Sequence, residues 1–509
     1  MTDGRRARLR SALWWVAALA LPALLLWSLA IVYGLWPMDE GLLLVYPERL
    51  LHGHLPYRSF WMSYPPGILL YLAPWYAAGA SLLAERVAAF VLHLAIVVVA
   101  TVLVSPRGRP SPLWAFAFAL LVFGTGPGAF TYPAAVLCFV CAVLVLRDTL
   151  PARALAIALL LAAGLMRLEA FPAGALGLAL RAWLRRDEPA AFRRAAGDLA
   201  CFLLGAAAVL AASTLAFGMA FWRDTFIDPI LRISPGRRLP LSELLLDARY
   251  LPLALAAAAA VALGLTRSLR RATTDEAVPL LTAVSLVAAA QVLQRADWQH
   301  FFSGALPAAI LAGRLAFGRR GRRPLAVPFA ASTAGAGLAL LALTASPFTR
   351  PARPLGYAGD GLALIHGFAR FRSPAGAHWL PMASRPDVAT LDALRDAVRA
   401  RAGPGDTLYV GLASHASRTI SGPTFLYWWI GLPPATRYLE FAPGLTDRAS
   451  VQRAIVRDLQ HCRLVVLWTA PQPVEPNASR LAGSTLLDDY LTTHYRVAGD
   501  FGPYRLLVR

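Results

Sequence analysis

The chain contains no lysine, and each of its 49 basic side chains is an arginine. An arginine in this sequence therefore need not have been selected over lysine for its planar, bidentate geometry. Basic residues outnumber the 29 acidic ones and give a net charge of +20. They gather in short segments between apolar runs, which is typical of cytoplasmic loops that face anionic lipid headgroups and argues against a nucleic-acid partner.

Cysteine is scarce, with four in 509 residues. Cys138 and Cys141 have a C-x-x-C spacing, but they lie in the apolar segment AVLCFVCAVLVL, where two small side chains on one helix account for them. The sequence therefore predicts no disulfide framework and no zinc site.

Charged residues of all kinds make up only 15% of the chain, against 57% hydrophobic residues. This composition excludes an ordinary soluble protein and predicts a polytopic α-helical membrane protein. Many apolar runs approach the roughly twenty residues that a membrane-spanning helix needs. They cover residues 12–36, 67–83, 86–104, 113–123, 129–146, 154–180, 198–218, 250–266, 277–293, 300–317 and 325–345. With 154–180 counted as one passage, the sequence predicts about 11 transmembrane helices.

The basic segment RRARLR precedes a first apolar run that is longer than a signal-peptide core, so we expect an uncleaved anchor with the N-terminus inside. The strongly basic loops then fall inside, at residues 181–194, 267–271 and 319–323. Four segments fall outside: 37–66, 219–249, 294–299 and the tail after 346. Two weakly basic loops, 105–112 and 147–153, also fall outside, against the positive-inside rule. Splitting 154–180 into two passages would invert everything after it.

After residue 346 the composition predicts a soluble extracytoplasmic α/β domain of about 160 residues, a usual domain size. SRPDVATLDALRDAVRARAGPGDTLYVGL reads as an amphipathic helix, a turn and a buried strand, and DRASVQRAIVRDLQHCRLVVLW repeats that order. YRVAGDFGPYRLLVR predicts a closing hairpin. We therefore expect a membrane module over 1–345 and a second domain over 346–509.

Asp39 and Glu40 form an acidic pair at the outer end of the first apolar run. A pair of solvated helix-end carboxylates would look the same. However, residues 41–66 are too apolar for a free loop and too charged to span, which predicts amphipathic helices along the outer interface. Such a platform holds the acidic pair where a lipid headgroup and a water-soluble molecule meet, and the YPPG segment then leads back into the membrane.

Arg167 and Glu169 interrupt an apolar passage, where each charge costs roughly 2.5–3.5 kcal/mol on insertion scales. An internal ion pair between packed helices would explain them, and so would an arginine that lines a cavity and binds a lipid phosphate. Arg295, Asp297 and His300 lie within six residues at an outer corner. Arg295 and His300 are candidates for binding a phosphate, although a plain polar loop would look similar. The outer loop 219–249 is either a solvated, mobile loop or a lid over the donor.

Residues 38–75, MDEGLLLVYPERLLHGHLPYRSFWMSYPPGILLYLAPW, resemble the first outer loop of the GT-C membrane glycosyltransferases. The similarity is to the bacterial branch grouped with aminoarabinose transferases and protein O-mannosyltransferases. The shared features are the acidic pair, the arginine-bearing amphipathic helix, Gly53, Pro56-Tyr57 and the YPPG segment. The similarity extends over roughly residues 10–345.

The resemblance implies an enzyme of the bacterial inner membrane that moves a sugar from a polyprenyl-phosphate donor, with inversion, to an extracytoplasmic glycan, lipid or protein. It implies that a carboxylate at Asp39 or Glu40 acts on the acceptor hydroxyl, and that Arg167, Arg295 and His300 hold the donor phosphate. The candidate substrate contacts are Tyr57, Arg58, Tyr64, Glu169 and Asp297. A divalent cation, Mg²⁺ or Mn²⁺, is used by some members of the family. The alternatives are a lipid or anion transporter and a non-catalytic assembly protein of the envelope.

Overall fold

The computed structural model describes residues 3–32, 35, 37–77, 79–105, 110–126, 128–239, 251–296, 298–317, 370–373, 376–379, 388–416, 422–470 and 483–509. The chain divides into two compact units. The first contains Met1–Ala30, Val87–Ala212 and Pro240–Thr349, and the second contains Ile31–Arg86, Ser213–Leu239 and Arg350–Arg509. The second unit thus combines the first outer loop with the C-terminal segment. The predicted boundary at residue 346 lies outside the described residues.

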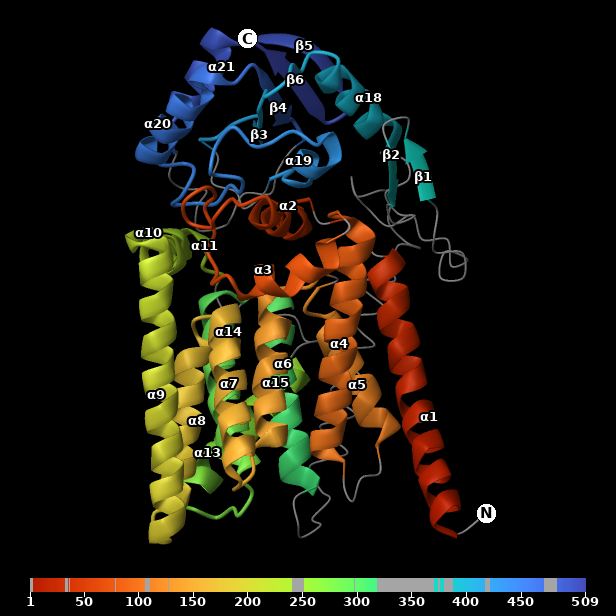
Figure 1. Cartoon of the computed structure of the whole chain (residues 1–509), viewed down its shortest axis with the longest axis vertical. Coiled ribbons are helices and arrows are strands. Elements are labelled where there is room, and N and C mark those ends of the chain that lie inside the picture. Colours follow the sequence, from red (N-terminus) through yellow and green to blue (C-terminus); the bar gives the residue numbers. More distant parts are fainter. Residues whose placement is uncertain are drawn as a thin grey trace. The chain divides into compact units, whose positions relative to one another are not determined.

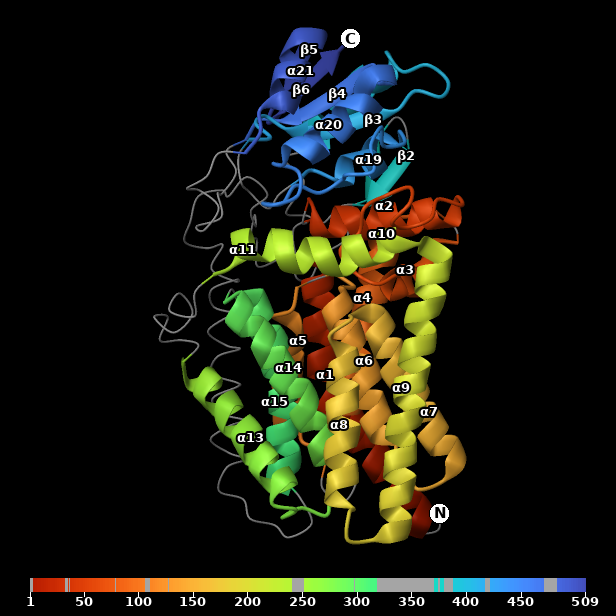
Figure 2. The same cartoon turned by 90° about the vertical axis from the view of Figure 1, so that its left-hand side faces the viewer.

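The first unit is a bundle of apolar helices (Figure 2). They are α1 (Asp3–Val32), α4 (Leu82–Val104), α5 (Pro112–Phe123), α6 (Thr131–Val145), α7 (Leu150–Met166), α8 (Ala170–Leu184), α9 (Pro189–Phe217), α13 (Leu251–Leu269), α14 (Ala277–Gln294) and α15 (Trp298–Phe317). In the described part of the chain, α4, α9, α13 and α14 are long and apolar enough to cross a membrane, and shorter apolar helices accompany them. The predicted helical membrane protein agrees with this architecture.

Two predicted passages are wrong. The run 154–180 is two helices, α7 and α8, because Arg167 adopts an extended conformation (φ −151°, ψ 127°) that ends α7. Among its described residues, the run 67–83 contains α3 (Gly67–Leu72), a 3₁₀ turn, η1 (Ala73–Tyr76), and the first two residues of α4. Ten helical residues rise about 15 Å, half the thickness of a bilayer core.

The second correction removes one passage and the first adds one. The predicted crossing direction of the helices between these two sites therefore reverses, whereas that of α9 and the later described helices is unchanged. Successive helices alternate in direction along the bundle, so the α4–α5 and α6–α7 connections lie at the same end as the α8–α9 and α13–α14 turns (Figures 1 and 2). The loop 147–153 therefore accompanies the basic loops 181–194 and 267–271, as the contact of Asp148 with Arg181 shows, and its predicted place on the opposite side is wrong. Residues 106–109 and the basic loop 319–323 lie outside the described residues. The arrangement removes the conflict with the positive-inside rule.

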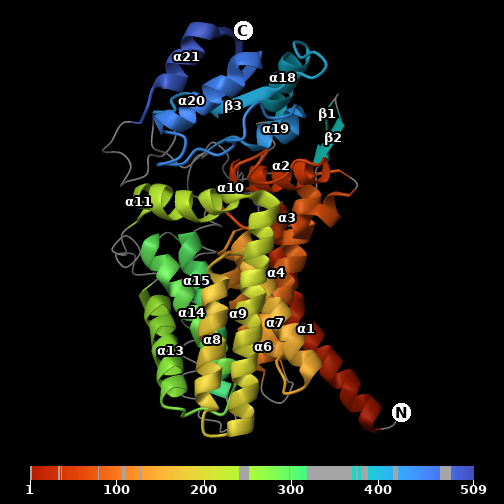
Figure 3. The same cartoon turned by 60° about the vertical axis from the view of Figure 1, so that its left-hand side comes forward.

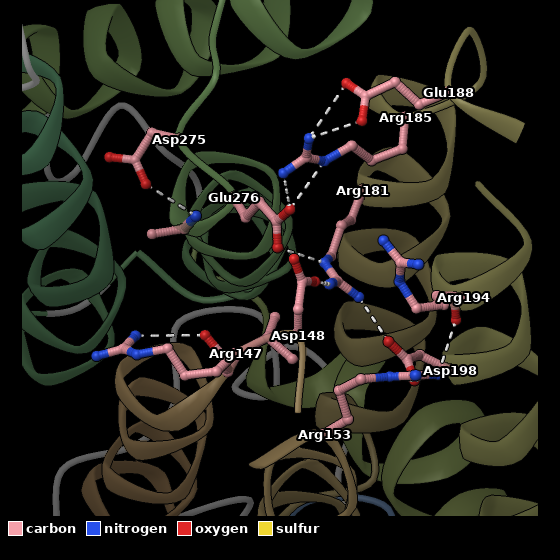
Figure 4. Close-up of polar contacts among 12 residues, drawn as sticks. Arg147, Asp148, Arg153, Arg181, Arg185, Glu188, Arg194, Asp198, Asp275 and Glu276 are labelled. Carbon is pink, nitrogen blue, oxygen red and sulfur yellow. Dashed lines mark hydrogen bonds and ion pairs between the residues drawn. The ribbon is translucent and has the colours of Figure 1, made fainter. Parts of the chain in front are cut away.

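Ion pairs tie this end of the bundle together (Figure 4). Arg181 of α8 is buried and pairs with Asp198 of α9 at 2.6 Å and with Glu276, before α14, at 2.9 Å. Asp198 also pairs with Arg153 of α7 at 2.6 Å, and Arg181 lies 3.7 Å from Asp148 in the α6–α7 connection.

Arg314 extends this network to the last helix of the described bundle. Its guanidinium pairs with Asp275 at 2.5 Å and donates to the carbonyl of Leu103, near the end of α4, at 2.8 Å. We call the set the loop-end network; its members are Asp148, Arg153, Arg181, Arg185, Glu188, Asp198, Asp275, Glu276 and Arg314.

The second unit carries α2 (Asp39–Leu51), which covers part of the segment where the sequence predicts amphipathic helices at the outer interface. Three consecutive helical segments, α10 (Met219–Trp222), the π-helix η3 (Arg223–Ile233) and α11 (Ser234–Arg237), form one rod (Figure 3). One face of this rod buries Asp224 and Asp228, and the other exposes Phe226 and Leu231. The described part of the predicted loop 219–249 is therefore helical, and its remainder from 240 lies outside the described residues.

A four-stranded mixed sheet forms the rest of the second unit (Figure 1). The strands run in the order β3 (Leu408–Leu412), β4 (Leu464–Trp468), β6 (Tyr504–Val508) and β5 (Arg496–Phe501); β3 and β4 are parallel and the other pairs antiparallel. The accompanying helices are α18 (Val388–Arg399), α19 (Phe425–Ile430), α20 (Ala449–Asp458), the 3₁₀ turn η6 (Leu459–His461) and α21 (Leu486–His494). A separate hairpin pairs β1 (Arg370–Ser373) with β2 (Gly376–Trp379).

The sheet has the helix-then-strand order that the sequence predicted. The helix α18 precedes β3, α20 precedes β4, and β5 and β6 form the closing hairpin. Tyr409, Ile455, Val465 and Leu507 belong to its hydrophobic core, in agreement with their apolar positions in the predicted strands and helices.

Candidate functional site

The acidic pair begins α2, and its two carboxylates have different surroundings. Glu40 is 0% exposed and receives two hydrogen bonds from Arg86, which is 1% exposed. The Nη2 atom of Arg86 donates to Oε2 of Glu40 at 2.9 Å, while Nε donates to Oε1. Such a bidentate pair satisfies both oxygens of the carboxylate. Glu40 therefore holds α2 against the start of α4 and is not positioned to take a proton from a substrate.

Asp39 is partly exposed and interacts electrostatically with a carboxyl that the sequence reasoning missed, Glu440. Burial raises the pKa of Glu440 to about 8; Arg237 of α11 lowers it, and the neighbouring Asp39 raises it further. A carboxyl with such a pKa is mostly protonated at neutral pH. We call Asp39, Glu440 and Arg237 the carboxylate cluster.

Backbone contacts bring the C-terminal segment to the start of α2. The N–H of Phe425 donates to the carbonyl of Pro37 at 3.1 Å. Gly41 packs so tightly that any side chain there would overlap the backbone of Thr424 and Phe425. The hydroxyl of Thr424 in turn donates to the carbonyl of Leu439 at 2.7 Å, directly before Glu440. Only glycine at position 41 allows this approach.

The three predicted substrate contacts of the first outer loop divide into buried and exposed residues. Tyr57 is 0% exposed, and its hydroxyl donates to the carbonyl of Tyr64 at 2.6 Å. Its φ of +64° is unusual for a residue with a side chain, so its surroundings hold it in place. Tyr57 therefore shapes the loop, whereas Arg58 is exposed and Tyr64 is partly buried.

Buried acidic side chains anchor the rod of α10, η3 and α11 to the C-terminal segment. Asp224 pairs with Arg437 and with Arg223, and Asp228 accepts a hydrogen bond from the indole of Trp61 at 3.4 Å. Burial raises the pKa of Asp224, and the positive charge of Arg437 opposes this shift. The backbone N–H of Trp61 donates to the carbonyl of Arg437 at 2.8 Å. These contacts join η3 and the first outer loop to the C-terminal segment.

In the first unit, Arg167 and Glu169 occupy the turn between α7 and α8. Arg167 pairs with Glu169 at 2.8 Å, and its guanidinium lies 5.6 Å from the ring centre of Tyr132. Glu169 accepts a further hydrogen bond at 2.5 Å from the side chain of Gln291 on α14. The two residues thus form an ion pair within the turn and not between packed helices, and they line a small cavity with apolar side chains of α6, α8 and α14.

The same end of the bundle carries the other predicted phosphate ligands. Arg295 caps α14, one turn beyond Gln291, and its N–H donates to the carbonyl of that residue at 3.0 Å. His300 lies in the first turn of α15 and is partly buried. The structure thus gathers Arg167, Arg295 and His300 at the end of the bundle opposite the loop-end network, while Asp297 lies outside the described residues.

Two residues of these sites were within reach of sequence reasoning and two were not. Arg86 lies beside Glu85 in the otherwise apolar segment SLLAERVAAF, and charges in such a segment indicate buried partners. Gln291 is a polar interruption of the same kind. Glu440 and Tyr132 carry no such signal, because each is an ordinary residue for its local segment.

No group of three or more histidine, cysteine, aspartate or glutamate side chains suited to a metal ion occurs among the described residues. In the carboxylate cluster, Arg237 also brings a positive charge to the two carboxyls. These residues do not fit a divalent cation, and the Mg²⁺ or Mn²⁺ that the resemblance implies stays a prediction.

No family model and no curated protein matches the chain. Solved structures do. One is ArnT from Cupriavidus metallidurans bound to undecaprenyl phosphate, which is 13% identical, with a TM-score of 0.54 and 97% of each chain covered. Another is the oligosaccharyltransferase AglB from Archaeoglobus fulgidus in complex with an inhibitory peptide and a dolichol-phosphate; it is 12% identical, with a TM-score of 0.44, covering 89% of this chain and 69% of that one. The similarity to ArnT shows that the chain has a GT-C-like glycosyltransferase fold.

Proposed function

We propose that the protein is a membrane glycosyltransferase that moves a sugar from a polyprenyl-phosphate donor to an acceptor outside the cytoplasmic membrane. The observation that carries this proposal is the position of Asp39. It is a partly exposed carboxylate at the start of an interfacial helix, on a fold whose similar structure ArnT is bound to undecaprenyl phosphate. Its neighbour Glu40 is occupied by Arg86.

The proposed reaction is a single inverting displacement. An acceptor oxygen forms a bond to the anomeric carbon of the sugar, and the bond from that carbon to the phosphate oxygen breaks, leaving its electron pair on the phosphate. Asp39 takes the proton from the acceptor hydroxyl as this oxygen attacks. Polyprenyl phosphate is a good leaving group, so the protein has to supply a base and a site for the anionic carrier.

Three side chains support the binding of an anionic carrier: Arg167, Arg295 and His300 lie at one end of the helical bundle. Of these, Arg167 already has Glu169 as a partner. A phosphate that binds at Arg167 would therefore compete with that carboxylate. Arg58 and Tyr64, the less buried of the predicted loop contacts, remain proposed contacts for the acceptor, and Glu169 and Asp297 for the donor sugar.

The orientation in the membrane is proposed from charge. The loop-end network lies at the end that carries the arginine-rich turns, so we place it at the cytoplasm and place the first outer loop and the C-terminal segment outside. In this arrangement the reaction takes place at the outer surface of a bacterial inner membrane, where acceptors of the cell envelope are available.

The test compares Asp39→Asn with Glu40→Gln in full-length protein reconstituted into liposomes. The donors are a panel of undecaprenyl-phosphate monosaccharides, the acceptors are a cell-envelope extract, and release of undecaprenyl phosphate is measured. We expect wild-type protein to release the carrier and Asp39→Asn to lose at least 100-fold in rate while melting at the wild-type temperature. Glu40→Gln should lose folded protein, with turnover per folded molecule retained. Normal turnover by Asp39→Asn would overturn the proposal.

A further inference from the structure

One corner of the helical bundle clamps the α8–α9 turn to the end of α13. The indole N–H of Trp183, in the last turn of α8, donates to the carbonyl of Leu269 at 3.0 Å. Leu269 is the last residue of α13, and the last carbonyls of a helix have no partner within it. Arg271, just beyond α13, pairs with Asp187 of the α8–α9 turn. Two contacts between side chains and the opposite element therefore hold these ends together.

Arg271 adopts a backbone conformation that favours glycine. Its φ is +54°. It ends α13 in a Schellman motif, in which its N–H donates to the carbonyl of Ser268 at 3.2 Å and the N–H of Ala272 donates to that of Arg267 at 2.8 Å. Glycine would adopt this conformation without steric cost. The strain at Arg271 therefore accompanies the placement of its guanidinium against Asp187.

The clamp carries an excess of positive charge. Arg186 and Arg271 both contact the carboxylate of Asp187, with Arg186 at 3.7 Å. Arg270 is exposed, and within the described part of the chain it has no carboxylate partner. Arg185 of the same turn belongs to the loop-end network and has its own carboxylate partners (Figure 4). Three guanidiniums at this corner thus share one carboxylate.

An exposed apolar surface lies directly beside these arginines. Trp183 is 41% exposed and Leu269 is 50% exposed. The guanidinium carbon of Arg186 lies 3.9 Å from the ring centre of Trp183, and this stacking restricts where the charge can lie. Arg270 directly follows Leu269 in the chain. We call Trp183, Arg186, Leu269 and Arg270 the Trp183 corner.

The depth of the Trp183 corner favours a lipid as its occupant. The helix α13 is long and apolar enough to cross a membrane, so its last residue lies near the boundary between hydrocarbon and headgroups. Tryptophan is enriched at that boundary, and basic pockets between helices there bind acidic headgroups. A soluble anion would contact the arginines and leave Trp183 and Leu269 exposed to water. An anionic phospholipid contacts both kinds of side chain.

We propose that the Trp183 corner is a specific site for one anionic phospholipid of the leaflet at the arginine-rich end of the bundle. Arg186 and Arg270 bind its phosphate, and the first methylenes of an acyl chain pack against Trp183 and Leu269. The lipid supplies negative charge that Asp187 alone does not provide. The site lies at the end of the bundle opposite the predicted ligands of the donor phosphate, so it is independent of the proposed transfer.

The test is native mass spectrometry of the full-length protein titrated with phosphatidylglycerol in a nonionic detergent. Wild-type protein should bind one phosphatidylglycerol more tightly than phosphatidylcholine. Arg186→Gln and Arg270→Gln should each weaken this binding about fivefold, the effect of one arginine at an anionic surface. Both side chains are exposed, so the two variants should melt like the wild type in detergent without added lipid. Displacement of the lipid by inorganic phosphate would assign the site to a soluble anion and overturn the proposal.

Arg147→Gln is the matched control, because Arg147 is an exposed arginine of the α6–α7 connection whose side chain donates to the carbonyl of Leu146 at 3.3 Å. It should bind phosphatidylglycerol like the wild type. Equal losses in all three variants would indicate a diffuse basic surface and overturn the specific site. Wild-type affinity in both Arg186→Gln and Arg270→Gln would overturn it as well.

A photoactivatable phosphatidylglycerol locates the site without relying on affinity. With a diazirine near the start of one acyl chain, it should crosslink in nanodiscs to peptides that contain Trp183 or Leu269, as identified by mass spectrometry. Excess unlabelled phosphatidylglycerol should suppress these crosslinks. Crosslinks spread evenly over the apolar helices, or unaffected by the competitor, would contradict a site at this corner.

Discussion

Arg86 holds both carboxylate oxygens of Glu40, and both side chains are almost completely buried. Removing one member of a buried ion pair leaves the other uncompensated, which costs about 3–5 kcal/mol. We therefore expect Glu40→Gln to lower the unfolding midpoint strongly, as measured by thermal melting in detergent. In Glu40→Gln the guanidinium loses its carboxylate partner on α2, while Glu85 lies 3.7 Å from it.

The double variant Glu40→Gln, Arg86→Met is the control for this prediction. It removes both charges at once, and we expect it to recover most of the lost stability, since neutral replacements of a buried pair are often tolerated. A single variant that melts like the wild type would show that the pair contributes little to the fold.

Tyr57 was a candidate substrate contact, and its burial predicts a structural role instead. Tyr57→Phe removes the hydrogen bond to Tyr64 and should cost about 1 kcal/mol of stability, because the carbonyl loses its donor. Tyr57→Ala also creates a cavity and should cost about 3–5 kcal/mol. Thermal melting and the rate of transfer are measured together. A rate that falls tenfold or more in Tyr57→Phe at unchanged stability would restore the role in substrate binding.

The reassigned loops can be tested by accessibility of single cysteines. In a background with the four native cysteines changed to serine, Asp148→Cys and Asp187→Cys should react with a membrane-impermeant maleimide only after the cells are opened, because both exposed positions lie at the arginine-rich end. His52→Cys, exposed at the end of α2, should react in intact cells. Labelling of Asp148→Cys and Asp187→Cys from opposite sides would contradict the alternation of helices described above.

Glu440 should also make the stability of the folded protein depend on pH. Its pKa of about 8 in the folded protein exceeds the ordinary value of 4.5 in the unfolded chain. The folded state therefore binds the extra proton between these values, and its stability falls as the pH rises through this window. We expect the melting temperature of the wild type to drop more between pH 5 and pH 9 than that of Glu440→Gln. Equal drops in the two proteins would contradict the raised pKa.

The sequence predicted the helical membrane architecture and the strand order of the sheet because both depend on local periodicity. It failed at 154–180, where Arg167 and Glu169 mark a turn that is only three residues long and was interpreted as an interruption within one passage. It failed again at 67–83, where the apolar residues around Pro74 form a short helix and a 3₁₀ turn. Hydrophobicity alone does not distinguish a passage from a buried turn.

The partners of the acidic pair were beyond prediction for a different reason. Arg86 lies 46 residues from Glu40, and Glu440 is separated from Asp39 by most of the chain. Asp39 and Glu40 have nearly the same chemistry in sequence. Their roles differ because Glu40 binds Arg86 of α4, whereas Asp39 interacts with Glu440 of the C-terminal segment.

The loop-end network also has a consequence for how the chain is assembled. Arg181 and Arg185 share the carboxylate of Glu276, which is synthesised about ninety residues later, after α9 and α13. Until that turn is inserted, Arg181 has Asp198 as a counter-ion and Arg185 has Glu188, but the carboxylate that joins the two arginines is missing. Glu276 therefore links α8 to the start of α14 only after α9 and α13 have been made.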